Sequence, residues 1–262
     1  MEVYNVAGDG VNLHRFEPLP ADLRRMQAAD LVLASGKNLE PYLGRLKSSL
    51  KGVTVIEVGL TIPSLTVDTN AAHPGCATHG KAGEHEAVSL DPHWWHSVDN
   101  MRRAARVVAK ALTEKDPAGG KYFIERAGAY GRRLDDLQRW ANAELGNIPR
   151  EQRKLVTAHN AFGYFAREFG FEVIAVAGLN REQNTTPREQ AQTLDVVKKS
   201  GVRAVFPEQN TSGKVLDSMA ATLGTRLGSP LIADGNGTGK DAGFEAMIRH
   251  NVTSITQALT VP

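Results

Sequence analysis

Short apolar runs alternate with amphipathic stretches along most of this chain, and that alternation most constrains the fold it can adopt. The runs have the length and the apolar content of buried strands, and the stretches between them have the period of helices. Strands that alternate with helices predict parallel sheets covered by helices, which is the α/β class. The runs lie at residues 29–35, 53–58, 154–158, 172–177, 202–206 and 229–233.

One helix is marked at both ends. Thr186 is placed to act as the N-cap, Pro187 suits the first helical position, and Glu189 completes a capping box. Gly201 then provides the residue that most often ends a helix. The sequence therefore predicts a helix between Thr186 and Gly201.

The middle of the chain departs from the alternation. Residues 99–113 keep one apolar face and end at the break "DPAGG", after which a second apolar stripe runs for about six helical turns. Strand-helix alternation restarts after "GNIPRE". We therefore expect two α/β lobes, each with a central, mostly parallel sheet flanked by helices, at residues 1–118 and 147–262, joined by one long linking helix at 119–146. A single continuous α/β domain is the alternative. The stripe consists of Phe123, Ala127, Tyr130, Leu134, Leu137, Ala141 and Leu145.

Composition excludes several classes of protein. The 262 residues carry a formal net charge of only +2, which is too weak to indicate nucleic-acid binding. No apolar run approaches the roughly 20 residues of a membrane helix, and the first residues, "MEVYNVAGDG", lack the pattern of a signal peptide. Because Cys76 is the only cysteine, an internal disulfide is excluded.

Polar side chains follow three of the predicted strands. His159 comes directly after one, Asp234 directly after another, and Glu208 follows a third by one residue, whereas His14 and His93 each precede a predicted helix. Ligands bind at the carboxyl ends of strands in open α/β sheets. Three imidazoles and one carboxylate form a set suited to zinc, although no pair has the close spacing of a site on one helix.

Each of these residues also has a structural interpretation. A lone histidine after a strand is more often an ordinary core or surface residue, Asp234 precedes "GNGTG" and fits an Asx-turn, and Glu208 fits a cap for a helix near Ser212. The aperiodic segment 68–87, which holds His73, His79 and His85, is expected to be an exposed, mobile loop.

With these residues in place, the chain resembles the substrate-binding proteins of zinc and manganese ABC transporters, the metal receptors with a rigid linking helix. The resemblance runs from about residue 6 to the C-terminus and keeps the order of the family's landmarks. The matching segments are "NLHRFEPLPADLRRMQAADLVLASGKNLEPYL", "DPHWW", "TAHNAFGYFAREFG", "TTPREQAQTLDVVKKSGVRAVFPEQNTS" and "PLIADGNG".

The resemblance implies a ligand set and a cargo. The four ligands would be His14, His93, His159 and Asp234, and this nitrogen-rich set favours Zn²⁺ as the cargo, with Mn²⁺ or iron as the alternative. Glu208 would hold the second N–H of a ligand histidine, and His96 would have a supporting role. Three further histidines lie in the aperiodic loop: His73, His79 and His85. They either collect zinc and pass it to the site, or have no role in binding.

A closed set of four protein ligands leaves no position for a substrate, so we expect a receptor and not an enzyme. The rival is a zinc hydrolase in which Glu208 or Asp234 is the general base. The resemblance further implies a periplasmic or extracytoplasmic location, an ABC permease as partner, a zinc-donating metallochaperone as a second partner, and a monomeric state. Compared with the family pattern, the chain is expected to lack its first β-α unit and export signal, which would expose one sheet edge in the N-terminal lobe.

Overall fold

The computed structural model of this chain describes residues 2–8, 11, 13–68, 88–178, 186–235, 237 and 242–260. The predicted loop histidines His73, His79 and His85 lie outside these residues. Among the described helices, none is long and apolar enough to cross a membrane.

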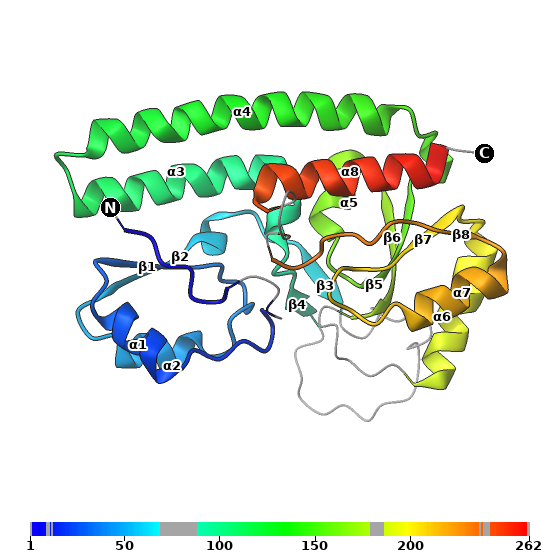
Figure 1. Cartoon of the computed structure of the whole chain (residues 1–262), viewed down its shortest axis with the longest axis horizontal. Coiled ribbons are helices and arrows are strands. Elements are labelled where there is room, and N and C mark those ends of the chain that lie inside the picture. Colours follow the sequence, from blue (N-terminus) through cyan, green and yellow to red (C-terminus); the bar gives the residue numbers. More distant parts are fainter. Residues whose placement is uncertain are drawn as a thin grey trace.

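The C-terminal half is built on a four-stranded parallel sheet with the order β6-β5-β7-β8 (Figure 1). Each strand ends at the same edge because the strands are parallel and are joined by helical crossovers. The strands are β5 (Lys154–His159), β6 (Glu172–Ala177), β7 (Ala204–Phe206) and β8 (Arg226–Leu227). The helices of this half are α5 (Gly163–Phe169), α6 (Pro187–Ser200), α7 (Lys214–Leu223) and α8 (Phe244–Thr260), and a 3₁₀ turn, η3 (Arg150–Gln152), precedes β5.

As far as the structure describes it, the N-terminal half has two separate two-stranded sheets in place of the single central sheet that was expected. Strands β1 (Leu31–Ala34) and β2 (Thr54–Glu57) form a two-stranded parallel sheet, whereas β3 (Thr66–Asp68) and β4 (Val88–Leu90) form an antiparallel pair that the sequence did not predict. Within the described residues, β1 and β2 pair only with each other. The remaining elements are α1 (Pro20–Gln27), α2 (Leu43–Ser49), η1 (Val58–Thr61), η2 (Trp94–His96) and α3 (Val98–Lys115).

Helix α4 (Gly120–Gly146) is the predicted long helix, and it packs along α3 from one half and α8 from the other (Figure 1). Its apolar stripe divides into two parts. Phe123, Ala127 and Tyr130 are half-buried and line an apolar slot of about 760 Å³ between α3, α4 and β1. The later members are buried in the main core: Leu134, Leu137, Ala141 and Leu145. The two-lobed α/β fold is therefore confirmed, while the exact lobe boundaries stay a prediction.

Helix α6 begins and ends at the residues that the sequence predicted. The prediction of a strand at residues 229–233, in contrast, is wrong. The Thr186 side chain accepts a hydrogen bond from the Glu189 N–H, and Gly201 ends the helix in the left-handed region. In contrast, residues 229–233 make only a single parallel bridge, Glu208 to Leu231, and the strand of that region is β8, at Arg226–Leu227. An apolar run indicates burial, and Leu231, Ile232 and Ala233 are buried without forming a regular ladder.

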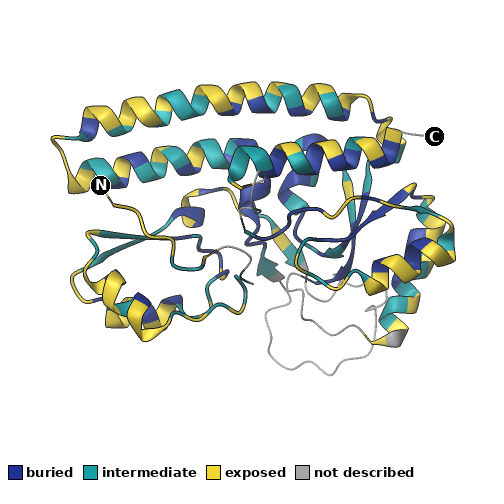
Figure 2. Ribbon diagram, viewed as in Figure 1, coloured by how far each residue is buried: buried dark blue, intermediate teal, exposed yellow. Residues whose placement is uncertain are grey.

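One large core cluster joins the two halves. It contains Trp94 and Val98 near the start of α3, Leu137 of α4, Leu155 of β5 and Val252 of α8. Figure 2 shows the same pattern, with buried residues concentrated where the helices meet the C-terminal sheet and exposed residues along the outer face of α4. The two halves are thus held against each other by shared packing as well as by the chain.

Candidate metal centre

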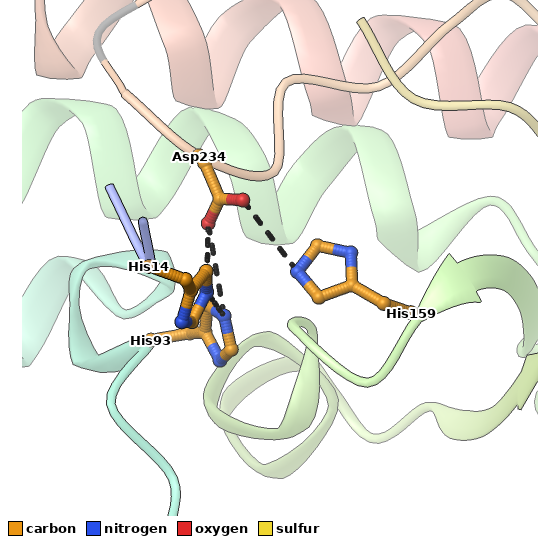
Figure 3. Close-up of side chains that lie close together, drawn as sticks. All are labelled: His14, His93, His159 and Asp234. Atoms are coloured by element: carbon orange, nitrogen blue, oxygen red, sulfur yellow. Dashed lines mark hydrogen bonds and ion pairs between the residues drawn. The ribbon is translucent and has the colours of Figure 1, made fainter. Parts of the chain in front are cut away.

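Four side chains from four separate segments meet where the two halves face each other (Figure 3). His14 comes from the turn before α1, and His93 from the residues just before η2. His159 ends β5, and Asp234 follows the Leu231 bridge. Each half of the molecule therefore supplies two of the four side chains that the sequence singled out.

The spacing of the four side chains fits one metal ion. Their potential ligand atoms all lie within 4.8 Å of one another. His14 Nε2 lies 3.2 Å from His93 Nε2, and Asp234 oxygens lie 3.7 Å from both His93 Nε2 and His159 Nε2. A tetrahedral zinc site with bonds of about 2.0–2.1 Å has ligand atoms about 3.3 Å apart. The cluster is thus close to the size that such an ion needs, and its ligand role stays a prediction.

Burial makes this cluster costly without a cation. The side chains of His93 and His159 are 0% exposed, that of Asp234 is 1% exposed, and that of His14 is 8% exposed. His159 Nε2 has no hydrogen-bond partner among the described residues. A buried polar atom without a partner costs free energy that a bound cation would recover.

Glu208 fixes which nitrogen of His159 faces the cluster. Its carboxylate accepts from the His159 backbone N–H at 3.0 Å and from Nδ1 at 2.6 Å. Strand register explains the contact: Thr157 of β5 pairs with Phe206 of β7, so His159 and Glu208 lie two residues further along neighbouring strands. Because a carboxylate accepts, Nδ1 carries the proton and Nε2 presents its lone pair. The Glu208 carboxylate therefore contacts His159. The alternative interpretation from the sequence was that Glu208 caps a helix near Ser212.

Asp91 does the same for His93, and the sequence interpretation missed it. One oxygen, Oδ1, accepts from the His93 backbone N–H at 2.9 Å and from Nδ1 at 2.8 Å. The side chain of Asp91 is 0% exposed. The signal was present in "DPHWW", because an aspartate two residues before a histidine can hold both its backbone and its ring in an Asx-type turn.

A buried lysine whose charge interacts with Asp91 was also missed. Lys37 is 2% exposed, and its Nζ donates to the carbonyl of Ile62 and to the hydroxyl of Ser64. Burial lowers the pKa of Lys37, while the charge of Asp91 acts in the opposite direction. No local pattern predicts this residue, because a lysine after a glycine is ordinary in any surface loop.

His96 lies beside the cluster but outside it, as its supporting role implied. Its Nε2–H donates to the carbonyl of Ala233 at 2.7 Å, and its ring packs on Phe162 with centroids 4.6 Å apart. Complete burial, with a contribution from His93, lowers the pKa of His96 to about 4. His96 is therefore neutral at physiological pH.

Removing either carboxylate that orients a ligand histidine is expected to weaken metal binding. Glu208→Gln and Asp91→Asn each keep the size of the side chain but replace a charged acceptor by an amide, which holds the ring N–H less strongly. Losses of this kind are typically about 10–100-fold in affinity. Titration of each metal-free variant with zinc measures the change.

A matched control for both variants is Glu245→Gln, which removes a carboxylate that pairs with Arg133 and is not part of the cluster. Its affinity is expected to equal that of the wild type. Unchanged affinity in both Glu208→Gln and Asp91→Asn would contradict the orienting role.

Two α/β lobes joined by a long helix, with three imidazoles and a carboxylate buried between them, define the class of metal-binding receptors that serve ABC transporters. The comparison with known families agrees. The profile of the family described as "Zinc-uptake complex component A periplasmic" matches residues 1–258, and the chain belongs to this family. It is therefore a substrate-binding receptor of a metal transport system that works with a permease, and it is not an enzyme.

Relatives of the chain differ in the metal that their names give. It is 29% identical over 254 residues to the manganese-binding lipoprotein MntA of Halalkalibacterium halodurans, covering 96% of this chain and 79% of that protein. It is 29% identical over 240 residues to the iron-binding protein YfeA of Yersinia pestis, covering 88% and 73%. The structure of the periplasmic zinc-binding protein TroA of Treponema pallidum superimposes with a TM-score of 0.81 at 27% identity, covering 96% of this chain and 88% of that one.

Proposed function

We propose that this protein captures Zn²⁺ between its two lobes and delivers it to the permease of an ABC transporter. The observation that carries the proposal is the set of three imidazole nitrogens and one carboxylate around one point. Two of the three rings are fixed by carboxylates so that Nε2 faces that point. Such a nitrogen-rich, near-tetrahedral set suits zinc, whereas Mn²⁺ prefers more oxygen ligands.

The site is built for holding an ion and not for turning over a substrate. All four positions of a tetrahedron are supplied by protein side chains, so no open position is left for a reacting molecule. Because imidazole binds metal only when it is deprotonated, affinity is expected to fall as the pH drops through the imidazole range. Acidification would therefore favour release.

The long helix limits how far the lobes can separate. Helix α4 packs against α3 on one side and α8 on the other, so opening would have to break buried contacts at one end. We propose that metal-free and metal-bound forms differ by small tilts of the lobes. The protein is further proposed to act as a monomer in the periplasm or its extracytoplasmic equivalent, and to receive zinc from solvent or from a zinc-donating metallochaperone.

Competition between metals tests the choice of zinc. The metal-free protein is titrated calorimetrically with Zn²⁺ and separately with Mn²⁺, and zinc is expected to bind at least about tenfold more tightly, in line with the usual order of divalent metals. The same titration of His14→Ala shows whether the measured heat comes from this site. Manganese binding as tightly as zinc would make this a manganese receptor of the same type, a reading that the name of MntA favours. A third titration, with Fe²⁺, tests in the same way the iron receptor that the name of YfeA favours.

A further inference from the structure

Two side chains of the N-terminal lobe hold the backbone that carries a predicted ligand of the C-terminal lobe. The indole N–H of Trp95 donates to the carbonyl of Ala233 at 3.0 Å, and Nε2–H of His96 donates to the same oxygen at 2.7 Å. Ala233 directly precedes Asp234. We call these two hydrogen bonds the Ala233 clamp.

The structure assigns Trp95 and His96 as positioning residues that fix Asp234 against His93 across the boundary between the lobes. This inference rests on the proposed function, and it names the part of the chain that sets the geometry of the same site. Neither Trp95 nor His96 needs to touch the metal for this role. Each acts through the peptide carbonyl that comes before the aspartate.

Through Trp95, the clamp connects the predicted ligands His93 and Asp234. Trp95 contacts the ring of His93 edge-on, with centroids 5.3 Å apart, while its N–H reaches Ala233. The same indole therefore touches one predicted ligand and holds the backbone of another. Because η2 includes both Trp95 and His96 and begins right after His93, a shift of this turn moves all three together.

The other side of the segment is held from within its own lobe. Asn251 of α8 accepts from the Ile232 N–H at 2.8 Å and donates to the Ile232 carbonyl at 2.9 Å. Residues 232 and 233 are thus gripped by two side-chain hydrogen bonds from each lobe. These bonds position Asp234 before an ion binds. The entropic cost of ordering this side chain on binding is therefore smaller.

The hydrogen bonds of His96 indicate that its Nε2–H is the group that acts in the clamp. A carbonyl oxygen only accepts, so Nε2 carries the proton, and Nδ1 remains buried with no hydrogen-bond partner among the described residues. An apolar residue of similar volume would fill this core position against Phe162 without leaving a polar atom unpaired. A histidine is favoured here because it can donate to Ala233 from inside the core.

Substitutions that separate the donor from the packing test the clamp. His96→Leu keeps the volume and removes the donor, whereas His96→Gln keeps an N–H that can reach Ala233. We expect His96→Leu to weaken zinc binding by about 10–100-fold and His96→Gln by less than about threefold. Affinities are measured by titrating the metal-free proteins, with circular dichroism to verify folding.

Trp94→Phe is the matched control. Trp94 lies in the same turn, and its indole N–H donates to Ser35 within the N-terminal lobe, at 3.2 Å to the carbonyl and 2.9 Å to the hydroxyl. This variant loses the same kind of hydrogen bond but leaves Ala233 untouched, so its zinc affinity is expected to match the wild type. Trp95→Phe, which removes the second donor of the clamp, is expected to weaken binding, and it serves in place of His96→Leu if that variant does not fold.

A purely structural role gives a different pattern of results. It would lower the melting temperature of the metal-free His96→Leu protein and leave both its zinc affinity and its zinc-induced thermal shift unchanged, which would overturn the inference. Equal losses of affinity in Trp94→Phe and His96→Leu, or in His96→Gln and His96→Leu, would overturn it as well. A wild type that binds manganese but not zinc overturns the choice of zinc alone, and the clamp is then measured with manganese. A wild type that binds neither metal overturns the proposed function and the clamp together.

Discussion

His159→Ala is expected to weaken zinc binding by at least about a hundredfold while the chain stays folded. The binding free energy of Zn²⁺ at structural sites with four protein ligands is about 10–16 kcal/mol, so each ligand contributes about 3 kcal/mol on average. Losing that contribution corresponds to a decrease in affinity of about a hundredfold. His159 is fully buried, and its Nε2 faces Asp234 at 3.7 Å. Titration of the metal-free variant with zinc measures the loss.

The control is Tyr122→Ala, which removes an exposed aromatic ring on α4, outside the cluster. Its zinc affinity is expected to match the wild type. Full affinity in a folded His159→Ala protein would remove His159 from the ligand set.

A double variant shows how Glu208 acts. His159→Ala leaves the Glu208 carboxylate in the interior without the imidazole N–H that it accepts. If Glu208 acts only by orienting His159, Glu208→Gln weakens binding in the wild type but causes no further loss in the His159→Ala background. Equal losses in both backgrounds would mean that Glu208 affects the ion by another route.

Leu137→Ala is expected to lower the free energy of unfolding by about 2–5 kcal/mol, because truncating a fully buried leucine removes apolar contact and leaves a cavity. Leu137 is 0% exposed on α4 and belongs to the core cluster that also contains Val98 of α3 and Ile248 of α8. Urea denaturation of the metal-free protein measures the change.

Ile124→Ala is the matched control on the same helix. Ile124 is 62% exposed, so its truncation is expected to change stability by less than about 0.5 kcal/mol. A loss of stability as large in Ile124→Ala as in Leu137→Ala would mean that α4 is stabilised along its whole length and not by the core at its C-terminal half. Zinc, which binds the folded form, is expected to raise the stability of both variants.

Local patterns predicted the regular elements well and the irregular ones poorly. The signals around Thr186 and Gly201 lie within a few residues of each other, and the helix they predict is present. The antiparallel pair β3–β4 was missed because its strands are three residues each and are separated by the segment 69–87. The run 229–233 was assigned as a strand because burial and strand formation give the same apolar signal.

The candidate site shows the same division. Histidines and aspartates that follow strands or precede helices identified His14, His93, His159 and Asp234 as candidates. Their approach to within 4.8 Å depends on four segments that are far apart in the sequence. Asp91 and Lys37 were not predicted. Asp91 contacts a histidine only two residues away in a turn, and Lys37 is a buried residue of a loop, and neither arrangement produces a periodic signal in the sequence.

The sequence by itself determined the α/β class, the long helix and the identity of the polar residues at the strand ends, because these depend on periodicity and on short-range capping. Only the tertiary structure decided that the β5–β7 register sets Glu208 against His159, that Asp91 holds His93, and that Trp95 and His96 reach across to Ala233. The physical reason is that orientation and distance between segments come from packing. A buried site of this kind is defined by contacts between residues up to 220 positions apart, as between His14 and Asp234.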